Sequence, residues 1–291
     1  MMIRFPTSLE GWLPFVNAAL YVLQIVITAV SFSTSDATRN VKTPIEPADF
    51  AFAIWNLIYA LLLATVVVDA VFPAYSLFAK AEKPTVLRVC FSLSCVFNAG
   101  WVLLFNNGLP SVAGVDITLL WMTLLPIYLF ANVEREARPF RWRQYLFSEL
   151  GLRLYLSWIT AAMVISWAIA AQRAFGDLTL GANLGLLGLV VVVALAGVAY
   201  GHDPVIGLVT VWALYGLAVK NTNELSGEEL QLQVRIQSAA ALAAGVVFAM
   251  TVLSMVEQRM SQRRHSRAWL AYVKLDNDDA NARRGDYGSI R

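Results

Sequence analysis

A short apolar stretch, FAIWNLIY at residues 52–59, carries side chains that are unusual inside a membrane span. Trp55, Asn56 and Tyr59 bring an indole, a carboxamide and a phenol together within five positions. On an α-helix, side chains three and four positions apart share a face. Such a face offers aromatic surfaces for stacking and polar groups that orient a ligand. It predicts one wall of a cleft for a flat, amphipathic, largely apolar molecule.

The same pairing of indole and polar side chain recurs in three later apolar segments. FNAGW places Asn98 three positions before Trp101, and LSWITAA places Trp158 between a serine and a threonine. Because a carboxamide facing lipid would leave its hydrogen-bonding groups unsatisfied, we expect these faces to point into a helix bundle. The candidate ligand-binding residues are Trp55, Asn56, Tyr59, Asn98, Trp101, Trp121 and Trp158.

Two interpretations of this pattern stay open. Asn, Ser and Thr side chains often form hydrogen bonds between membrane helices without any ligand. Trp residues near the ends of spans are also common at the membrane interface. On that interpretation the same residues hold the helices together, and no cleft exists.

The sequence gives no support for a catalytic or metal centre. His202 and His265 are the only histidines, one in a short turn and one in the C-terminal tail. No pairing of nucleophile and base is recognisable. Cys90 and Cys95 lie five positions apart and point to different sides of a helix, so neither a disulfide nor a metal site is expected. We predict no catalytic residue, no metal and no cofactor.

The elements that carry these residues are long apolar segments. The 291 residues are 58% hydrophobic and only 14% charged, with a mean hydropathy of +0.60, whereas soluble domains are about 25% charged. The composition and the apolar runs predict an all-α, polytopic transmembrane helical bundle. The net charge of +2 suggests no nucleic-acid partner. The eight predicted spans are 11–32, 50–72, 87–105, 112–131, 150–171, 181–200, 203–220 and 236–256.

The distribution of basic residues predicts the orientation of the chain. With eight spans, 17 of the 22 Lys and Arg residues fall on the side that holds both termini. Basic residues in short loops favour the cytoplasmic side, so both termini are predicted to be cytoplasmic. Beyond Glu257, residues 258–275 resemble a basic interfacial helix. The polar segment DNDDANARRGDYGSIR that follows has almost nothing to bury, so it is predicted to be disordered.

Glycines concentrate in the sixth predicted span. GANLG and GVAYG both have small residues four positions apart, which lets two helices approach closely. This pattern indicates helix packing, with a partner helix from the same chain or from another.

Four segments carry motifs in the order found in the second to fifth spans of one membrane-protein family. EPADFAFAIWNLIYALL matches the second-span pattern at Pro47, Trp55 and Tyr59. FNAGWVLLF matches the third-span pattern at Asn98 and Trp101. AGVDITLLWMTLL and LSWITAAMVISWAIA resemble the fourth and fifth patterns, the latter through the tryptophan at 158. This order resembles the tryptophan-rich sensory protein family, also called the translocator protein or peripheral benzodiazepine receptor family.

The resemblance implies a five-helix unit over residues 1–172 that binds porphyrins, or in some members sterols. It also implies a homodimer as a possible assembly. The family's usual fifth-span Asn falls on Ser166 here. The first loop, which helps to cover the pocket in the family, lacks its common aromatic residues. Residues 173–257, with three further helices, and the tail 258–291 lie outside this unit and are similar to an extended form of the family.

The predicted function is binding of a flat hydrophobic molecule, such as a porphyrin or a sterol, by an integral membrane protein that senses or transports it. One alternative is a substrate-coupled transporter that uses all eight helices. Another is an enzyme that breaks down a porphyrin.

Overall fold

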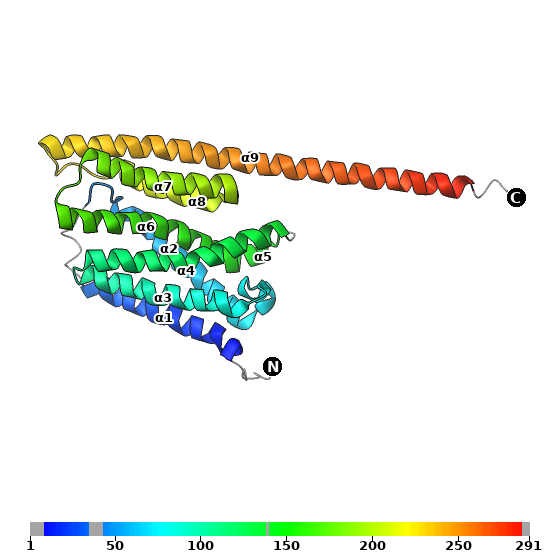
Figure 1. The fold of residues 1–291 in the computed structure, drawn as a ribbon, viewed down its shortest axis with the longest axis horizontal. Helices are drawn as coiled ribbons and strands as arrows, with labels where there is room; N and C mark the ends of the chain where they lie inside the picture. Colours follow the sequence, from blue (N-terminus) through cyan, green and yellow to red (C-terminus); the bar gives the residue numbers. More distant parts are fainter. Residues whose placement is uncertain (1–8, 35–42, 138–139, 287–291) are drawn as a thin grey trace.

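The computed structural model describes residues 9–34, 43–137 and 140–286 as a bundle of long helices (Figure 1). Every regular element within these residues is helical, which confirms the all-α prediction. The long helices are α1 (Leu9–Thr34), α2 (Ile54–Val71), α3 (Pro84–Asn106), α4 (Pro110–Ala137), α6 (Leu150–Phe175), α7 (Leu180–Gly201), α8 (Pro204–Ala218) and α9 (Gly227–Asp286). The short elements are the 3-10 helices η2 (Asp49–Ala53), η3 (Pro73–Tyr75) and η4 (Phe78–Lys80), the helix α5 (Trp142–Gln144) and the π-helix η5 (Tyr145–Glu149).

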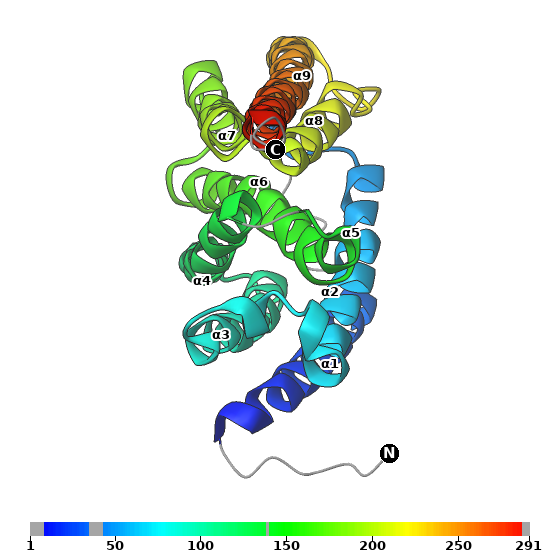
Figure 2. The same cartoon turned by 90° about the vertical axis from the view of Figure 1, so that its right-hand side faces the viewer.

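The helices lie in layers, and successive long helices run in opposite directions. Figure 2 shows α7, α8 and α9 on one side, α6 in the middle and α1 with α3 on the other side. In Figure 1, α1 begins at the end of the bundle towards which α9 runs. This arrangement places the start of α1 and the extension of α9 at the same end.

Seven helices in the described part of the chain are long and apolar enough to cross a membrane. The exception among the eight predicted spans is α8, which has 15 residues and is therefore about 22 Å long, against roughly 30 Å of hydrocarbon. A backbone group at each end of α8 forms a hydrogen bond with another part of the protein. The Asp203 carboxylate accepts a hydrogen bond from the Val205 N–H, and the Gly216 carbonyl accepts one from the Ala48 N–H. A short helix with such ends is tolerated at membrane depth.

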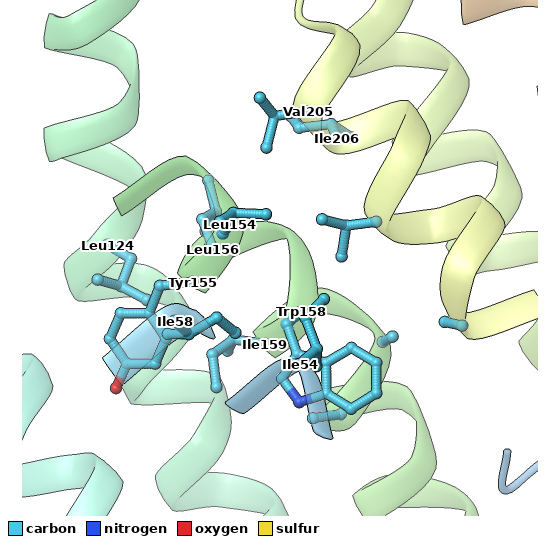
Figure 3. Packing of buried hydrophobic residues seen from close by; sticks show 14 of the residues in the cluster. Ile54, Ile58, Leu124, Leu154, Tyr155, Leu156, Trp158, Ile159, Val205 and Ile206 are labelled. Atoms are coloured by element: carbon cyan, nitrogen blue, oxygen red, sulfur yellow. The ribbon is translucent and has the colours of Figure 1, made fainter. Parts of the chain in front are cut away.

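Helix α6 forms the centre of the packing and is buried on nearly all sides. Figure 3 shows Tyr155, Trp158 and Ile159 of α6 beside Ile54 and Ile58 of α2. The approach to α2 is close at Gly151, where an added methyl group would lie 2.9 Å from the backbone of Leu61. Helix α6 therefore packs between the two outer layers with large side chains such as Trp158 and small residues such as Gly151.

The glycines of α7 divide into two groups. A methyl group at Gly197 would lie 2.7 Å from Ile206, and one at Gly201 would lie 2.8 Å from the Tyr128 hydroxyl, so both permit contacts within the chain. Gly185 and Gly188 have nothing within 4 Å of such a group. The GVAYG half of the pattern therefore serves internal packing, and the GANLG half faces away from this chain.

Helix α9 continues without interruption to Asp286 and projects far beyond the bundle (Figure 1). The sequence predicted a separate interfacial helix and then disorder in this region. The structure differs because residues 246–284 contain neither Gly nor Pro, the residues that most strongly end helices. Only the last five residues of the predicted disordered segment, 287–291, lie outside the described residues.

Candidate ligand-binding site

A line of buried polar side chains runs along α1 and was missed in the sequence analysis. Asn17 and Gln24 are each 1% exposed, and Tyr21, Thr28 and Ser31 are also buried. Their spacing of four, three, four and three positions places them on one helical face. That periodicity is visible in the sequence and would have identified α1 as a contributor to the polar interior.

This polar face of α1 contacts α2 and α3. The Gln24 amide nitrogen donates to Asn98 Oδ1 at 2.9 Å, and the Ser92 hydroxyl donates to Asn17 Oδ1 at 2.5 Å. The Tyr21 hydroxyl donates to the Tyr59 carbonyl at 2.5 Å. The predicted site residue Asn98, which is fully buried, therefore lies inside a polar seam between α1 and α3.

An aromatic cluster from α2 and α6 lies beside this seam. The Trp55 ring stacks on Tyr59 with centroids 5.2 Å apart and an interplanar angle of 24°. Trp55 also meets Trp158 edge-on at 6.5 Å, and Phe52 meets Trp158 in the same manner at 5.7 Å. Tyr155, one helical turn before Trp158, is 6.1 Å from the Trp55 ring. The structure thus brings Trp55, Tyr59 and Trp158 together.

Three polar groups of this region lack a hydrogen-bond partner among the described residues. They are the Asn98 amide nitrogen, the Tyr155 hydroxyl and the Trp158 indole nitrogen, and all three atoms are buried. A buried donor without a partner costs about 1–3 kcal/mol, so such groups are rare unless something else satisfies them. Acceptor atoms of a bound molecule would do so.

Trp101 and Trp121 have other roles in the structure. The Trp101 indole nitrogen donates to the Ser166 hydroxyl at 3.1 Å, and that of Trp121 donates to the Thr160 hydroxyl at 2.9 Å. These bonds join α3 and α4 to α6. Ser166, which stands where the resembled family has an Asn, acts here as the acceptor for an indole on α3.

The expectation that Asn56 faces the interior is wrong. Its side chain is exposed, whereas Ile54 and Ile58 on the same helix are buried. Asn56 lies two positions from each of these residues, which is about 200° around an α-helix. The buried stripe of α2 is aliphatic, Trp55 and Tyr59 flank it, and Asn56 lies on the opposite side.

With this geometry established, comparison with known proteins identifies the family. A family model described as TSPO-like protein matches residues 14–253. The chain belongs to the TSPO-like protein family. The matched region extends from α1 into α9 and so includes α7, α8 and the first part of α9. No curated protein and no solved structure matches the chain.

The first loop of this TSPO-like protein is attached to the C-terminal helices. The Thr43 carbonyl accepts a hydrogen bond from the Lys220 ammonium at 3.3 Å, and the Pro44 carbonyl accepts one from the Gln233 amide at 3.2 Å. The Trp212 indole donates to the Ala51 carbonyl at 2.9 Å. Helices α8 and α9 and the turn between them therefore fix the segment that leads into the aromatic cluster.

Two hollows of this TSPO-like protein lie away from the aromatic cluster. One small hollow lies at the end of α4, and another lies between α6, α7, α8 and the first loop. Neither is lined by a predicted site residue. The side chains of the aromatic cluster are packed against one another, so a bound ligand requires Trp55 and its neighbours to move apart.

Buried ion pairs lie near one end of this TSPO-like bundle. Arg88 donates to both carboxylate oxygens of Asp69 at 2.9 Å, and Arg153 contacts Asp203 and Glu149. Neither ion pair was predicted from the sequence. The Asp69–Arg88 pair joins the consecutive helices α2 and α3, whereas the Arg153–Asp203 pair joins segments 50 residues apart in the sequence.

Proposed function

We propose that this TSPO-like membrane protein binds a flat, largely apolar molecule of the porphyrin or sterol class between α1, α2, α3 and α6. The observation that carries the proposal is the group of three buried, unpartnered polar atoms on Asn98, Tyr155 and Trp158. They lie in the region where aromatic rings of Trp55 and Tyr59 offer flat surfaces. Family membership supports a membrane role for the chain but does not name a ligand.

Each residue has a distinct proposed role. Trp55 and Trp158 contact the faces or edges of the ligand, since aromatic rings stack favourably on flat molecules. The Asn98 amide and the Tyr155 hydroxyl donate to its polar groups, such as the carboxylates of a porphyrin or the hydroxyl of a sterol. Trp101 and Trp121 have no contact with the ligand in this proposal, and their indoles hold α3 and α4 against α6.

A titration with protoporphyrin IX tests the proposal. The purified protein in detergent is titrated while the absorbance of the porphyrin is followed, with a sterol as a competing ligand. We expect saturable binding that Trp55→Ala weakens at least tenfold, because a wall of the site is lost. Asn56→Ala is the matched control, since this neighbouring side chain is exposed. Non-saturable binding, or equal losses in both variants, would remove the support for a site at Trp55.

The buried charges favour a second candidate function, substrate-coupled transport by all eight helices. Arg153 joins α6 to the turn between α7 and α8 through Asp203, and ionisable groups inside membrane proteins often mark transport pathways. Loss of uptake into vesicles without loss of binding in Asp203→Asn would favour this candidate. Porphyrin breakdown, the enzymatic alternative, predicts product formation over time during the same titration.

A further inference from the structure

Aromatic rings on η2 link the exposed surface of α8 with the buried aromatic cluster. Phe50 of η2 meets the rings of Trp212 and Tyr215 edge-on, with centroids 5.5 and 6.0 Å apart. All three of these side chains are exposed. Two positions further along η2, Phe52 meets the fully buried Trp158 edge-on. This short helix therefore places one ring at the surface and one against the interior of the proposed ligand site.

The backbone of η2 and of the residues before it is attached to α8 and α9. The Trp212 indole donates to the Ala51 carbonyl at 2.9 Å, and the Ala48 N–H donates to the Gly216 carbonyl at 3.0 Å. A methyl group at Gly216 would lie only 2.7 Å from the Ala51 Cβ atom, so a residue without a side chain permits this approach. With the bonds that α9 and the preceding turn donate to its first two carbonyls, the segment 43–53 is held over most of its length.

Phe52 is the ring of the cluster whose backbone is easiest to displace. The other rings lie on the long helices α2 and α6, whereas Phe52 lies on a 3-10 helix of five residues. Hydrogen bonds in 3-10 helices have poorer geometry than those in α-helices. Ile45 and Pro47 of the segment 43–53 also line the hollow between α6, α7 and α8, so packing on that side is incomplete. Separation of the packed rings therefore begins most easily at η2.

We propose that residues 43–53 are a movable cover of the ligand site and that α8 and α9 hold this cover closed. A flat apolar molecule dissolves in the bilayer and first contacts the exposed rings of Phe50, Trp212 and Tyr215, since aromatic surfaces stack on flat molecules. It reaches Trp158 when η2 carries Phe52 away. This inference rests on the proposed function and adds the route by which the ligand enters. Helices α8 and α9 then control the rate of ligand exchange.

Stopped-flow absorbance of protoporphyrin IX with the full chain in detergent tests the route. Trp212→Phe removes the N–H that donates to Ala51 and keeps a ring beside Phe50. We expect association and dissociation both to become about fivefold faster, because one hydrogen bond that holds the cover is lost. The affinity should change little, since the bond is broken only while the ligand passes. Damage to the site itself would instead lower the affinity.

Trp167→Phe is the matched control. The Trp167 indole also donates a hydrogen bond, to the Thr118 hydroxyl at 3.0 Å, and its exposed fraction of 40% is close to the 37% of Trp212. The bond joins α6 to α4, away from the cover. We expect both rates to equal those of the unaltered protein. An equal acceleration in both variants would overturn the proposal, because the effect would not depend on the cover.

A reversible cross-link tests the same movement in the opposite direction. In the double variant Pro47→Cys and Gly216→Cys, the Cβ atoms would lie 3.1 Å apart, close to the roughly 3.5–4.5 Å of a disulfide. Oxidation is expected to slow association about tenfold or more, because entry requires a movement that the bond prevents. Reduction should restore the rate in the same sample. The unaltered protein, oxidised in the same way, controls for Cys90 and Cys95.

Hydrogen exchange measures the cover without a ligand. Trp212→Phe should accelerate exchange of the Ala48 N–H, which donates to the Gly216 carbonyl, and Trp167→Phe should not. Unchanged exchange in Trp212→Phe, or unchanged porphyrin rates despite faster exchange, would overturn the proposal. Absence of saturable porphyrin binding in the unaltered protein would overturn the proposed function and the entry route with it. The exchange data would then report separately whether α8 restrains the segment.

Discussion

The Arg153 guanidinium donates to the Asp203 carboxylate at 2.5 Å, and the side chains are 1% and 0% exposed. The pair joins α6 to the turn between α7 and α8, and Asn132 of α4 accepts a second bond from the same guanidinium nitrogen at 2.7 Å. Asp203 also caps α8 through the Val205 N–H. This buried ion pair thus joins α6 to the start of α8.

We predict that Asp203→Asn destabilises the bundle by about 1.5–3 kcal/mol, because it weakens a charge-assisted hydrogen bond and leaves the Arg153 guanidinium to the Glu149 carboxylate, 3.5 Å away. Thermal unfolding in detergent measures the change. Asp177→Asn provides a control, since Asp177 is exposed and the hydrogen bond that it accepts from the Gln172 amide is long, at 3.3 Å. Equal stability of Asp203→Asn and the unaltered protein would show that the pair contributes nothing.

A pair of glycine substitutions tests the packing of the last helices. A methyl group at Gly207 would overlap the Thr251 hydroxyl of α9 and lie 3.0 Å from its Cβ atom. We expect Gly207→Ala to cost about 1–3 kcal/mol, as overpacking usually does. Gly185→Ala faces open space and should raise stability by up to about 1 kcal/mol through helix propensity. The reverse order of stabilities would contradict the placement of α8 against α9.

The bond between Trp121 and Thr160 allows a direct test of the packing role. Trp121→Phe removes the indole N–H that donates to Thr160 at 2.9 Å and should cost about 1 kcal/mol. Thr160→Val removes the acceptor. In a double-mutant cycle, unfolding measurements should show that the two losses are not additive. Full additivity would mean that the bond makes no net contribution.

The topology of the chain makes a prediction for labelling from outside. Asn223 and Glu82 are exposed, and they lie in turns that the positive-inside pattern assigns to opposite sides. In sealed vesicles with the cytoplasmic side inward, a membrane-impermeant maleimide should label Asn223→Cys at once. Glu82→Cys should react only after the vesicles are opened. The opposite result would place both termini on the outer side.

Much of the fold could be predicted from hydropathy because membrane spans must be long and apolar. The predicted span 87–105 became α3 at Pro84–Asn106, and 181–200 became α7 at Leu180–Gly201. The prediction of disorder near the C-terminus differs from the structure, in which a polar segment continues α9 to Asp286. The π-helix η5 also extended the fifth span backward to Trp142, through polar residues that hydropathy treats as a loop.

The site was less predictable, because its residues come from several helices. Trp55, Tyr59 and Trp158 come together and Asn98 lies in the polar seam beside them. Their positions in the short motifs had marked them as candidates, and their role in ligand binding stays a prediction. The orientation of Asn56 depended on which stripe of α2 is buried, and the aliphatic stripe of Ile54 and Ile58 decided it. Gln24, which donates to Asn98, and Tyr155, which lies beside Trp55, were not predicted, because neither belongs to one of the short motifs.

The most direct test of the proposed ligand site compares two tryptophan variants by porphyrin absorbance. Trp158→Phe removes a buried indole N–H that has no hydrogen-bond partner among the described residues, while an aromatic side chain is kept. Trp121→Phe removes one that already bonds to Thr160. If the site lies between α1, α2, α3 and α6, Trp158→Phe weakens protoporphyrin IX binding about tenfold and Trp121→Phe leaves it almost unchanged. Equal affinity of both variants and the unaltered protein would contradict this site.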